Sequence, residues 1–401
     1  MKKISCLIIS VMILVMSGCA ALPQSARTGP VQNGQNEQTV QDQVPSAENG
    51  EQLSEETLRA LFEKHGMKAG TCVSSMVIEN PAMEKLILEQ FDSVTMENAM
   101  KPDAVINREK SRKEGKIVVE YGNDAKKVLN WAKENGMKMR GHTLVWYSQT
   151  PEWIFHEDFD ETKGFVDREE MLVRMEDLIR GNFEQIDELG CSDLFYAYDV
   201  VNEGWMENGI MRRNHWSEII GDDYMWYAFY YADKYAPEET DLYYNDYNEQ
   251  FKADAICKFV QTLTDEDGRY LIDGIGLQAH FFTADDLNGY LKAVDRLSET
   301  GLKLELTELD VGLGKYQAPL KATDENLNKQ GQFYYELING LFERADAGKI
   351  DMDAITFWGF TDLISWRKEY SPQLFDSLFA EKPAYYGVMQ IKEKAGFEEE
   401  Q

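Results

Sequence analysis

The feature that most limits the possible folds is an alternation of apolar segments rich in β-forming residues with longer segments of helical periodicity. The helical segments include residues 124–135, 168–186 and 325–347, where apolar residues recur at spacings of three and four. The strand-like segments are residues 67–73, 93–98, 137–146, 195–203, 241–247, 272–280, 302–310 and 352–360. Strands that alternate with helices indicate parallel β/α units, and eight such units predict a closed (β/α)8 TIM barrel over residues 54–401.

Two glutamates, Glu203 and Glu308, lie at the ends of predicted strands. All strands of a parallel β/α barrel end on one face, so we expect the two carboxylates to converge there. Such a pair is what hydrolysis of a glycosidic bond requires, because one group protonates the leaving oxygen and the other attacks or stabilises the sugar carbon. A carboxylate at a strand end can instead cap a helix or join a loop ion pair. The short polar residues that precede them, Asn202 and Thr307, favour the catalytic interpretation.

Polar and aromatic residues also mark the ends of the other predicted strands. Carboxamides, a lysine and imidazoles can bind sugar hydroxyls, and aromatic faces stack on the apolar side of a pyranose ring. These residues are Glu97, Asn98, Lys101, His142, Trp146, Tyr147, Asn245, Tyr247, Gln278, His280, Asp310 and Trp358, with Trp366 in the following loop. The set predicts a carbohydrate-binding cleft.

The charge balance excludes one large class of partners. The chain has 401 residues, with 41 basic and 71 acidic side chains and a formal net charge of -30. A phosphate backbone would be repelled, so nucleic acid is not an expected partner. A hydrophobic content of 43% suffices for a large core. The excess of acid is most simply a solvated surface.

The first nineteen residues are predicted to be an export signal. Lys2 and Lys3 precede an apolar stretch over residues 4–16, and Cys19 follows two small residues. This pattern resembles a bacterial lipobox and predicts cleavage before Cys19, lipid attachment to its thiol, and a cell-surface lipoprotein. Met16 departs from the usual leucine, and the alternative is an ordinary signal peptide of a secreted protein. Residues 20–53 are polar and predict a disordered tether.

The three cysteines that follow residue 53, Cys72, Cys191 and Cys257, have no spacing typical of a metal site. We interpret them as small buried hydrophobic residues without a disulfide. No metal or other cofactor is expected, and we expect a monomer whose partner is its substrate.

Seven ordered motifs resemble glycoside hydrolase family 10, the endo-β-1,4-xylanases with a (β/α)8 barrel. The resemblance covers about residues 58–394. The motifs are Thr95–Pro102, Arg140–Trp146, Asp199–Glu203, Tyr244–Asn248, Gly276–His280, Thr307–Asp310 and Thr356–Gly359. The resemblance implies a retaining mechanism in which Glu203 is the acid/base and Glu308 is the nucleophile.

Two further roles follow for residues beside the carboxylates. We expect His280 to donate a hydrogen bond that keeps Glu308 ionised, although an isolated histidine would more simply be structural. We interpret Asn202 as a donor to the 2-hydroxyl of the sugar that is cleaved, with a strand-end cap as the alternative. Glu203 must start protonated, and the charge on nearby Glu308 is expected to raise its pKa.

The resemblance also assigns the substrate-binding residues. The residues for sugars on the non-reducing side of the cut are Glu97, Asn98, Lys101, His142 and Trp146. Gln278 is assigned to the lining of the cleft, and Trp358 and Trp366 to its aromatic walls. Tyr247 is assigned as a stacking platform beyond the scissile bond. Four further tryptophans, Trp131, Trp153, Trp216 and Trp226, are interpreted as packing residues. Tyr147 departs from the family, which usually has a second histidine there, and it cannot become a cation near neutral pH.

The sequence therefore predicts an endo-acting xylanase that hydrolyses internal bonds of xylan or xylo-oligosaccharides by double displacement. The same carboxylates would serve a β-1,4-glucanase or a glycosidase of mixed specificity, because only room for a C6 hydroxymethyl group separates the substrates. A surface lipoprotein that binds glycans without cleaving them would lack a catalytic carboxylate, and both are present.

Overall fold

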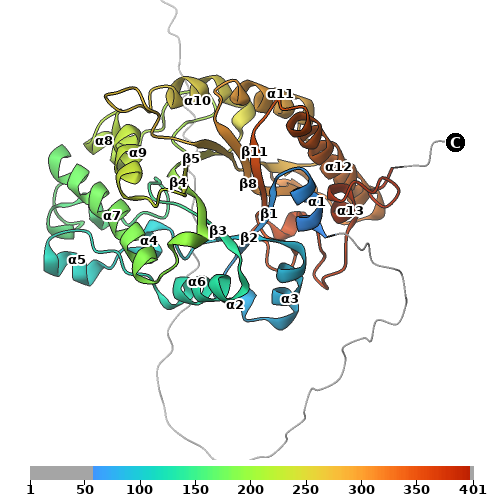
Figure 1. Cartoon of the computed structure of the whole chain (residues 1–401), viewed down its shortest axis with the longest axis horizontal. Coiled ribbons are helices and arrows are strands. Elements are labelled where there is room, and N and C mark those ends of the chain that lie inside the picture. Colours follow the sequence, from blue (N-terminus) through green and yellow to red (C-terminus); the bar gives the residue numbers. More distant parts are fainter. Residues whose placement is uncertain (1–56, 398–401) are drawn as a thin grey trace, which may run out of the picture. The chain divides into compact units, whose positions relative to one another are not determined.

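Within residues 57–397, which the computed structural model describes, eight parallel strands close into a barrel surrounded by helices (Figure 1). The strands follow one another around the ring in chain order, and the ring closes where the last strand pairs with the first. The predicted (β/α)8 barrel is therefore confirmed. The predictions for residues 1–19, for Cys19 and for residues 20–53 lie outside the described residues.

The barrel strands match the eight predicted segments, and most of them are shorter than predicted. Their bounds are β1 (Lys68–Val73), β2 (Ser93–Met96), β3 (Lys138–Gly141), β4 (Phe195–Asn202), β5 (Asp241–Asp246), β6 (Gly274–Leu277), β8 (Lys303–Gly312) and β11 (Met352–Phe357). Three short strands lie outside the ring: β7 (His280–Phe282), β9 (Gly314–Lys315) and β10 (Ala318–Pro319).

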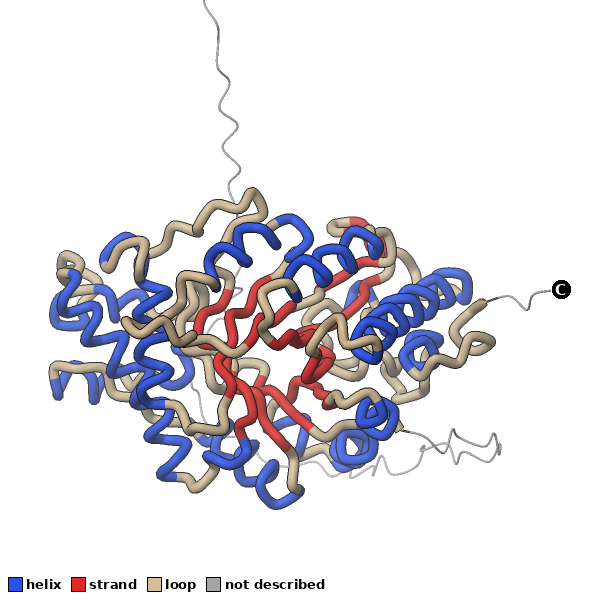
Figure 2. Tube along the Cα trace, turned by 45° about the horizontal axis from the view of Figure 1, so that its top comes forward, coloured by secondary structure: helices blue, strands red, loops and turns tan. Residues whose placement is uncertain are grey.

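Helices cover the outer face of the strands, as the tube view also shows (Figure 2). Those that precede β4 are α1 (Leu58–Lys64), α2 (Ser75–Ile78), α3 (Pro81–Gln90), α4 (Pro102–Val105), α5 (Arg108–Glu114), α6 (Asn123–Asn135) and α7 (Arg168–Glu188). Those that follow β4 are α8 (His215–Ile219), α9 (Tyr224–Tyr235), α10 (Ala253–Val260), α11 (Leu287–Ser298), α12 (Asp324–Asp346) and α13 (Pro383–Val388). Short 3-10 turns lie at Glu152–Phe155, Glu157–Phe159, Ser192–Leu194, Glu249–Phe251 and Lys368–Tyr370.

The three predicted long helices are confirmed to within two residues at each end. Helix α7 begins after Asp167, whose side chain accepts a hydrogen bond from the backbone of Glu170. Helix α6 ends at Gly136, whose φ of 67° is a left-handed conformation that glycine adopts without steric cost. Local signals in the sequence therefore set the ends of these helices.

The strands are buried on both faces, because helices cover the outside and side chains fill the inside. The interior is not purely apolar. Arg140 on β3 donates to both carboxylate oxygens of Asp199 on β4, and its Nε donates to Oε2 of Glu305 on β8 at 2.8 Å. Burial raises the pKa of Glu305 to about 7, against the pull of the guanidinium. A charged group thus links three strands inside the barrel.

The remaining cysteines are placed as predicted, since Cys72, Cys191 and Cys257 are all buried and unpaired. Among the helices of residues 57–397, none combines the length and the apolar character needed to cross a bilayer.

Candidate active site

The two predicted catalytic glutamates lie on the face where the strands end. Glu203 directly follows β4, and Glu308 lies inside β8 because this strand continues to Gly312, beyond its predicted end. The extra length pairs with β7, which the sequence had not separated from the sixth strand. Both carboxylates are buried, with 8% and 5% of their surface exposed, so their charges are only weakly solvated.

A chain of side-chain amides connects the two carboxylates. Gln278 Nε2 donates to Glu203 Oε1 at 3.1 Å and to Asn202 Oδ1 at 3.2 Å. Asn245 Nδ2 donates to the same Asn202 oxygen at 3.0 Å and to Glu308 Oε1 at 2.9 Å. The three amides, which we call the amide bridge, fix the position of one carboxylate relative to the other.

Asn245 belongs to this bridge, although its position in the sequence had indicated only a polar residue at a strand end. Its carbonyl oxygen accepts a hydrogen bond from Thr307 Oγ1 at 2.6 Å. Gly276 on β6 provides the space for the Asn245 side chain, because a Cβ at this position would lie only 2.4 Å from Asn245 Oδ1. The signal that could have found Asn245 is its place on one predicted strand with Tyr247.

His280 contacts two carboxylates, one through each ring nitrogen. Nε2 lies 3.2 Å from Glu308 Oε2, which places the predicted hydrogen bond, and Nδ1 lies 3.1 Å from Asp310 Oδ1. Burial alone would lower the pKa of His280, but the two carboxylates outweigh burial and raise this pKa to about 10. Asp310 is held in turn by Arg367 Nη1 at 2.5 Å and by Trp366 Nε1 at 3.0 Å. The imidazole is therefore a cation at neutral pH.

The surroundings drive the pKa values of the two glutamates apart. Burial would raise the pKa of Glu308, but the hydrogen bond from His280, the nearby His142 and Lys101 lower it to about 2. The pKa of Glu203 is raised, mainly by burial, and the hydrogen bond from Gln278 only partly opposes this. At neutral pH Glu308 is thus the ionised group, while Glu203 more readily keeps its proton.

The charge on Glu308 raises the pKa of Glu203, as expected, but it is not the main cause. Burial is the larger cause, and the buried Asp246 at the end of β5 acts more strongly than Glu308. Asp246 was missed because the sequence shows neither its burial nor its distance from Glu203.

Lys101 is buried, with 6% of its surface exposed, whereas a lone lysine would normally be solvated. Its ammonium donates to Asn98 Oδ1 at 3.1 Å and to Gln149 Oε1 at 2.9 Å, and it lies 5.1 Å from the centre of the Trp146 ring. Burial lowers its pKa, and the carboxylates of Glu308 and Glu97 act against this. Three predicted residues, Glu97, Asn98 and Trp146, are therefore brought together around Lys101, and Gln149 joins them without having been predicted.

His142 and the aromatic residues form the rest of the wall. His142 Nδ1 lies 2.8 Å from Asp199 Oδ2, and its ring meets the buried Trp358 edge-on at 5.3 Å. Trp366 is 56% exposed, and its ring lies 5.1 Å from that of His280. Trp366 therefore offers an open aromatic face, while Trp358 offers only a small part of its surface.

The four tryptophans that were interpreted as packing residues are buried or partly buried. Trp131, Trp153 and Trp216 are buried and Trp226 is partly buried. The indole of Trp216 donates to the backbone oxygen of Trp146 at 3.1 Å, so this packing residue supports the loop that carries Trp146.

A model of glycosyl hydrolase family 10 matches residues 57–391, which span nearly all of the described structure. The chain belongs to glycosyl hydrolase family 10. The motifs that suggested this family are the segments that carry the cleft residues just described.

Three known proteins illustrate the similarity of this family 10 chain to its relatives. It is 35% identical to endo-1,4-beta-xylanase B of Butyrivibrio fibrisolvens over 83% of this chain and 52% of that protein. It is 30% identical to exoglucanase XynX of Acetivibrio thermocellus over 90% of this chain and 31% of that protein. The chain thus spans about half, or less, of these curated relatives.

A solved structure gives the same picture. The endo-1,4-beta-D-xylanase 10B of Clostridium thermocellum, as a CBM22-1 and GH10 fragment complexed with xylohexaose, is 31% identical and has a TM-score of 0.76. The match covers 84% of this chain and 68% of that one.

Tyr147, the position at which this family 10 chain departs from the pattern, lies beside the acid/base candidate. It is 41% exposed, and burial together with the nearby carboxylate of Glu203 raises the pKa of its hydroxyl well above the usual range. Tyr147 is therefore neutral over the whole range in which a histidine would titrate.

Tyr247 has one ring face covered. Lys252 Nζ lies 4.3 Å from the centre of the ring, and the Tyr247 hydroxyl accepts a hydrogen bond from Arg212 at 3.0 Å. A sugar can therefore stack only on the opposite face of this predicted platform.

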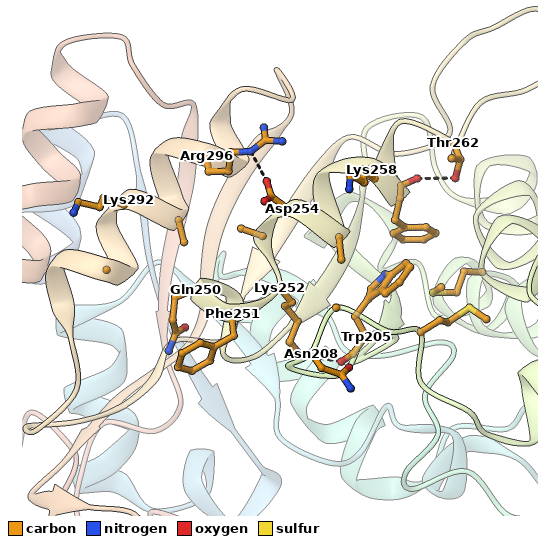
Figure 3. A pocket seen from close by; sticks show the side chains of 18 of the residues that line it. Trp205, Asn208, Gln250, Phe251, Lys252, Asp254, Lys258, Thr262, Lys292 and Arg296 are labelled. Carbon is orange, nitrogen blue, oxygen red and sulfur yellow. Dashed lines mark hydrogen bonds and ion pairs between the residues drawn. The ribbon is translucent and has the colours of Figure 1, made fainter.

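A groove of about 900 Å³ has Trp205, two residues after Glu203, in its wall (Figure 3). Its walls come from the loop after β4, with Trp205 and Asn208, from α10 and the segment before it, and from α11 with Arg296. None of the predicted substrate-binding residues lines this groove.

Proposed function

We propose that this family 10 protein is an endo-acting, retaining hydrolase of β-1,4-xylosidic bonds. The observation that carries the proposal is the pair of buried glutamates whose pKa values are driven apart, with Glu308 at about 2 and Glu203 raised. A nucleophile must be ionised and an acid must be protonated at the same pH, and the opposite directions of the two pKa shifts favour this division of roles. The xylanase names of its relatives support the choice of substrate.

In the first half-reaction a Glu308 oxygen attacks the anomeric carbon while Glu203 gives its proton to the departing glycosidic oxygen. A bond forms between the sugar and Glu308, and the glycosidic bond breaks. Glu308 loses its charge in this covalent intermediate, which favours ionised Glu203. In the second half-reaction Glu203 takes a proton from water, the water oxygen attacks the same carbon, and Glu308 leaves as a carboxylate.

Asn202 is proposed to bind the 2-hydroxyl of the sugar under attack. Its carbonyl oxygen already accepts hydrogen bonds from Asn245 and Gln278. Its Nδ2 makes only a long contact of 3.5 Å to Glu203, and this leaves donor capacity beside the acid/base. The amide nitrogen of Gln278 already donates to Asn202 and Glu203, so its carbonyl oxygen is the group proposed to accept a hydrogen bond from the substrate.

Sugars on the non-reducing side of the cut are proposed to bind the cluster around Lys101. This cluster places an ammonium, the Asn98 amide and the Glu97 carboxylate beside the Trp146 ring. Trp358 and Trp366 bound the same side, and Tyr247 stacks the sugar beyond the scissile bond. Polar groups would fix the hydroxyls while aromatic faces cover the apolar side of the ring.

Product analysis tests the proposal. Purified chain is incubated with glucuronoxylan and with carboxymethyl-cellulose in parallel, and Glu308→Ala serves as the blank. We expect xylobiose and xylotriose from xylan alone, and no products from the blank. The exoglucanase relative gives a second candidate, a β-1,4-glucanase, and release of products from the cellulose substrate alone would favour it.

We also propose that the protein is exported and acylated at Cys19, with residues 20–53 as a tether for the barrel. The support is the sequence, in which a charged start and an apolar stretch precede the cysteine. A labelled fatty acid fed to expressing bacteria should enter the wild-type chain but not Cys19→Ala, and only the wild type should remain with membranes. Equal labelling of both chains would refute acylation at Cys19.

A further inference from the structure

The acid/base candidate lies on a turn whose backbone is fully hydrogen-bonded. Glu203 has a φ of 57°, a left-handed conformation that is uncommon for a residue with a side chain. Its backbone N–H donates to the backbone carbonyl oxygen of Asn245 at 2.8 Å. The backbone N–H of the next residue, Gly204, donates to the Tyr244 hydroxyl at 3.0 Å. Such a conformation persists only where surrounding contacts hold it, and it is frequent at functional sites.

Two cations hold the carbonyl oxygens of this turn. Arg212 Nε donates to the oxygen of Glu203 at 2.9 Å, and the Arg212 backbone N–H donates to the oxygen of Gly204 at 2.7 Å. Lys252 Nζ donates to the backbone oxygen of Trp205 at 2.8 Å. Lys252 and Trp205 both form part of the groove wall (Figure 3). Lys252 is bound to Asp246 and fully buried, whereas Arg212 is only partly buried and reaches the cleft.

Arg212 also contacts the two tyrosines on the cleft side of the turn. Its guanidinium carbon lies 4.4 Å from the centre of the Tyr147 ring, and its Nη2 donates to the Tyr247 hydroxyl at 3.0 Å. Tyr147 lies close enough to the Glu203 carboxylate for that charge to act on its hydroxyl. One planar group therefore joins the backbone of Glu203 to both tyrosines around it.

We propose that Arg212 is the positioning residue of Glu203, which aims the carboxyl at the departing oxygen by holding the Glu203 carbonyl and both tyrosines with one guanidinium. The proposal rests on the proposed function, because it concerns proton donation to a leaving sugar. Arg212 acts through Glu203 and needs no contact with the reacting atoms. A lysine has no planar fork, so it cannot reach the carbonyl, the ring and the hydroxyl together.

A role in proton donation predicts losses that depend on the leaving group. Glu203 must protonate a poor leaving group such as phenol, while dinitrophenol leaves without a proton. For Arg212→Gln we expect kcat/KM to fall about 100-fold on phenyl β-xylobioside and less than about 3-fold on dinitrophenyl β-xylobioside. The difference is expected because a misplaced acid slows only a reaction in which the leaving group needs a proton. Arg213→Gln is the matched control, since Arg213 is exposed and forms an ion pair with Asp222 on the surface, and it should change neither rate.

A purely structural role would lower both rates equally, and this result would overturn the proposal. Thermal unfolding of each variant reports whether it folds. If Arg212→Gln does not fold, Arg212→Lys carries the same comparison, with the same selective loss expected. Full activity of Arg212→Lys on both substrates would also overturn the proposal, because a cation alone would then be enough. Failure of the wild-type chain to cleave either substrate would instead refute the proposed function.

Discussion

Among the single residues of the site, neutral amides and charged side chains have different effects on Glu203 and Glu308: the amides set their positions, and the charged groups set their protonation. The amide bridge of Asn202, Gln278 and Asn245 sets where the carboxylates lie. Burial and the charged neighbours set which carboxylate holds a proton. Changing a charged neighbour should therefore alter pH dependence more than geometry.

His280→Gln tests this separation at Glu308, the proposed nucleophile. Glutamine can still donate to Glu308 but carries no charge, so the pKa of Glu308 should rise from its value of about 2. Glu308 must be ionised to attack, and its ionised fraction is lost as the pH falls through its pKa. The acidic limb of the kcat/KM profile should thus move up by roughly 1–2 pH units. An acidic limb at the same pH as in the wild type would show that His280 does not set this pKa.

Tyr147→His tests the departure from the family pattern beside Glu203, the proposed acid/base. A histidine becomes a cation below its ordinary pKa of about 6.5, and a cation beside Glu203 favours the ionised carboxylate. The basic limb of the kcat/KM profile should therefore shift to lower pH, while Tyr147→Phe, which introduces no charge, should leave that limb closer to the wild type. An unchanged profile and product pattern in the histidine variant would remove this idea.

Among the elements, the stability of the β7–β8 pairing depends on the positive charge of His280. β7 pairs with the last residues of β8, and His280 at its start lies between Glu308 and Asp310 of β8. The pKa of His280 is raised to about 10, so its contribution to stability is fully present below about pH 6.5 and is lost as the pH rises through 10. The pairing should therefore weaken in alkali.

Thermal unfolding against pH checks this expectation. The Tm of the wild-type chain should fall more steeply between about pH 7 and 10 than the Tm of His280→Gln, which has no proton to lose there. His65→Gln, at a histidine paired with Asp346 outside the cleft, is the control and should keep the wild-type slope. Parallel curves for wild type and His280→Gln would refute the link.

The elements were also where sequence prediction was strongest. Apolar periodicity placed every barrel strand, because each is buried on both faces. It missed β7, which has only three residues and continues the segment after β6. It gave no role to Arg212 or Asp246, because their importance lies in contacts with Glu203 from other segments of the chain. Residue type and strand position could thus be predicted, but burial and long-range contacts could not.

At the scale of the whole molecule, the net charge of -30 sets a repulsion that folding has to overcome. Salt shortens the range of this repulsion from about 30 Å at 0.01 M to about 3 Å at 1 M. We therefore expect the Tm to rise with sodium chloride over this range, as differential scanning calorimetry would measure. A Tm that falls with salt would mean that attractive surface ion pairs outweigh the repulsion.

The amide bridge has a consequence for the reaction cycle as a whole. Its members do not titrate, and Gln278 can donate to Glu203 whether or not that carboxyl carries a proton. The spacing between Glu203, the proposed acid/base, and Glu308, the proposed nucleophile, therefore need not change as protons move from one half-reaction to the next. In the proposed double displacement the two carboxyl groups would change charge twice in each turnover, while the amides that hold them would keep the same hydrogen bonds.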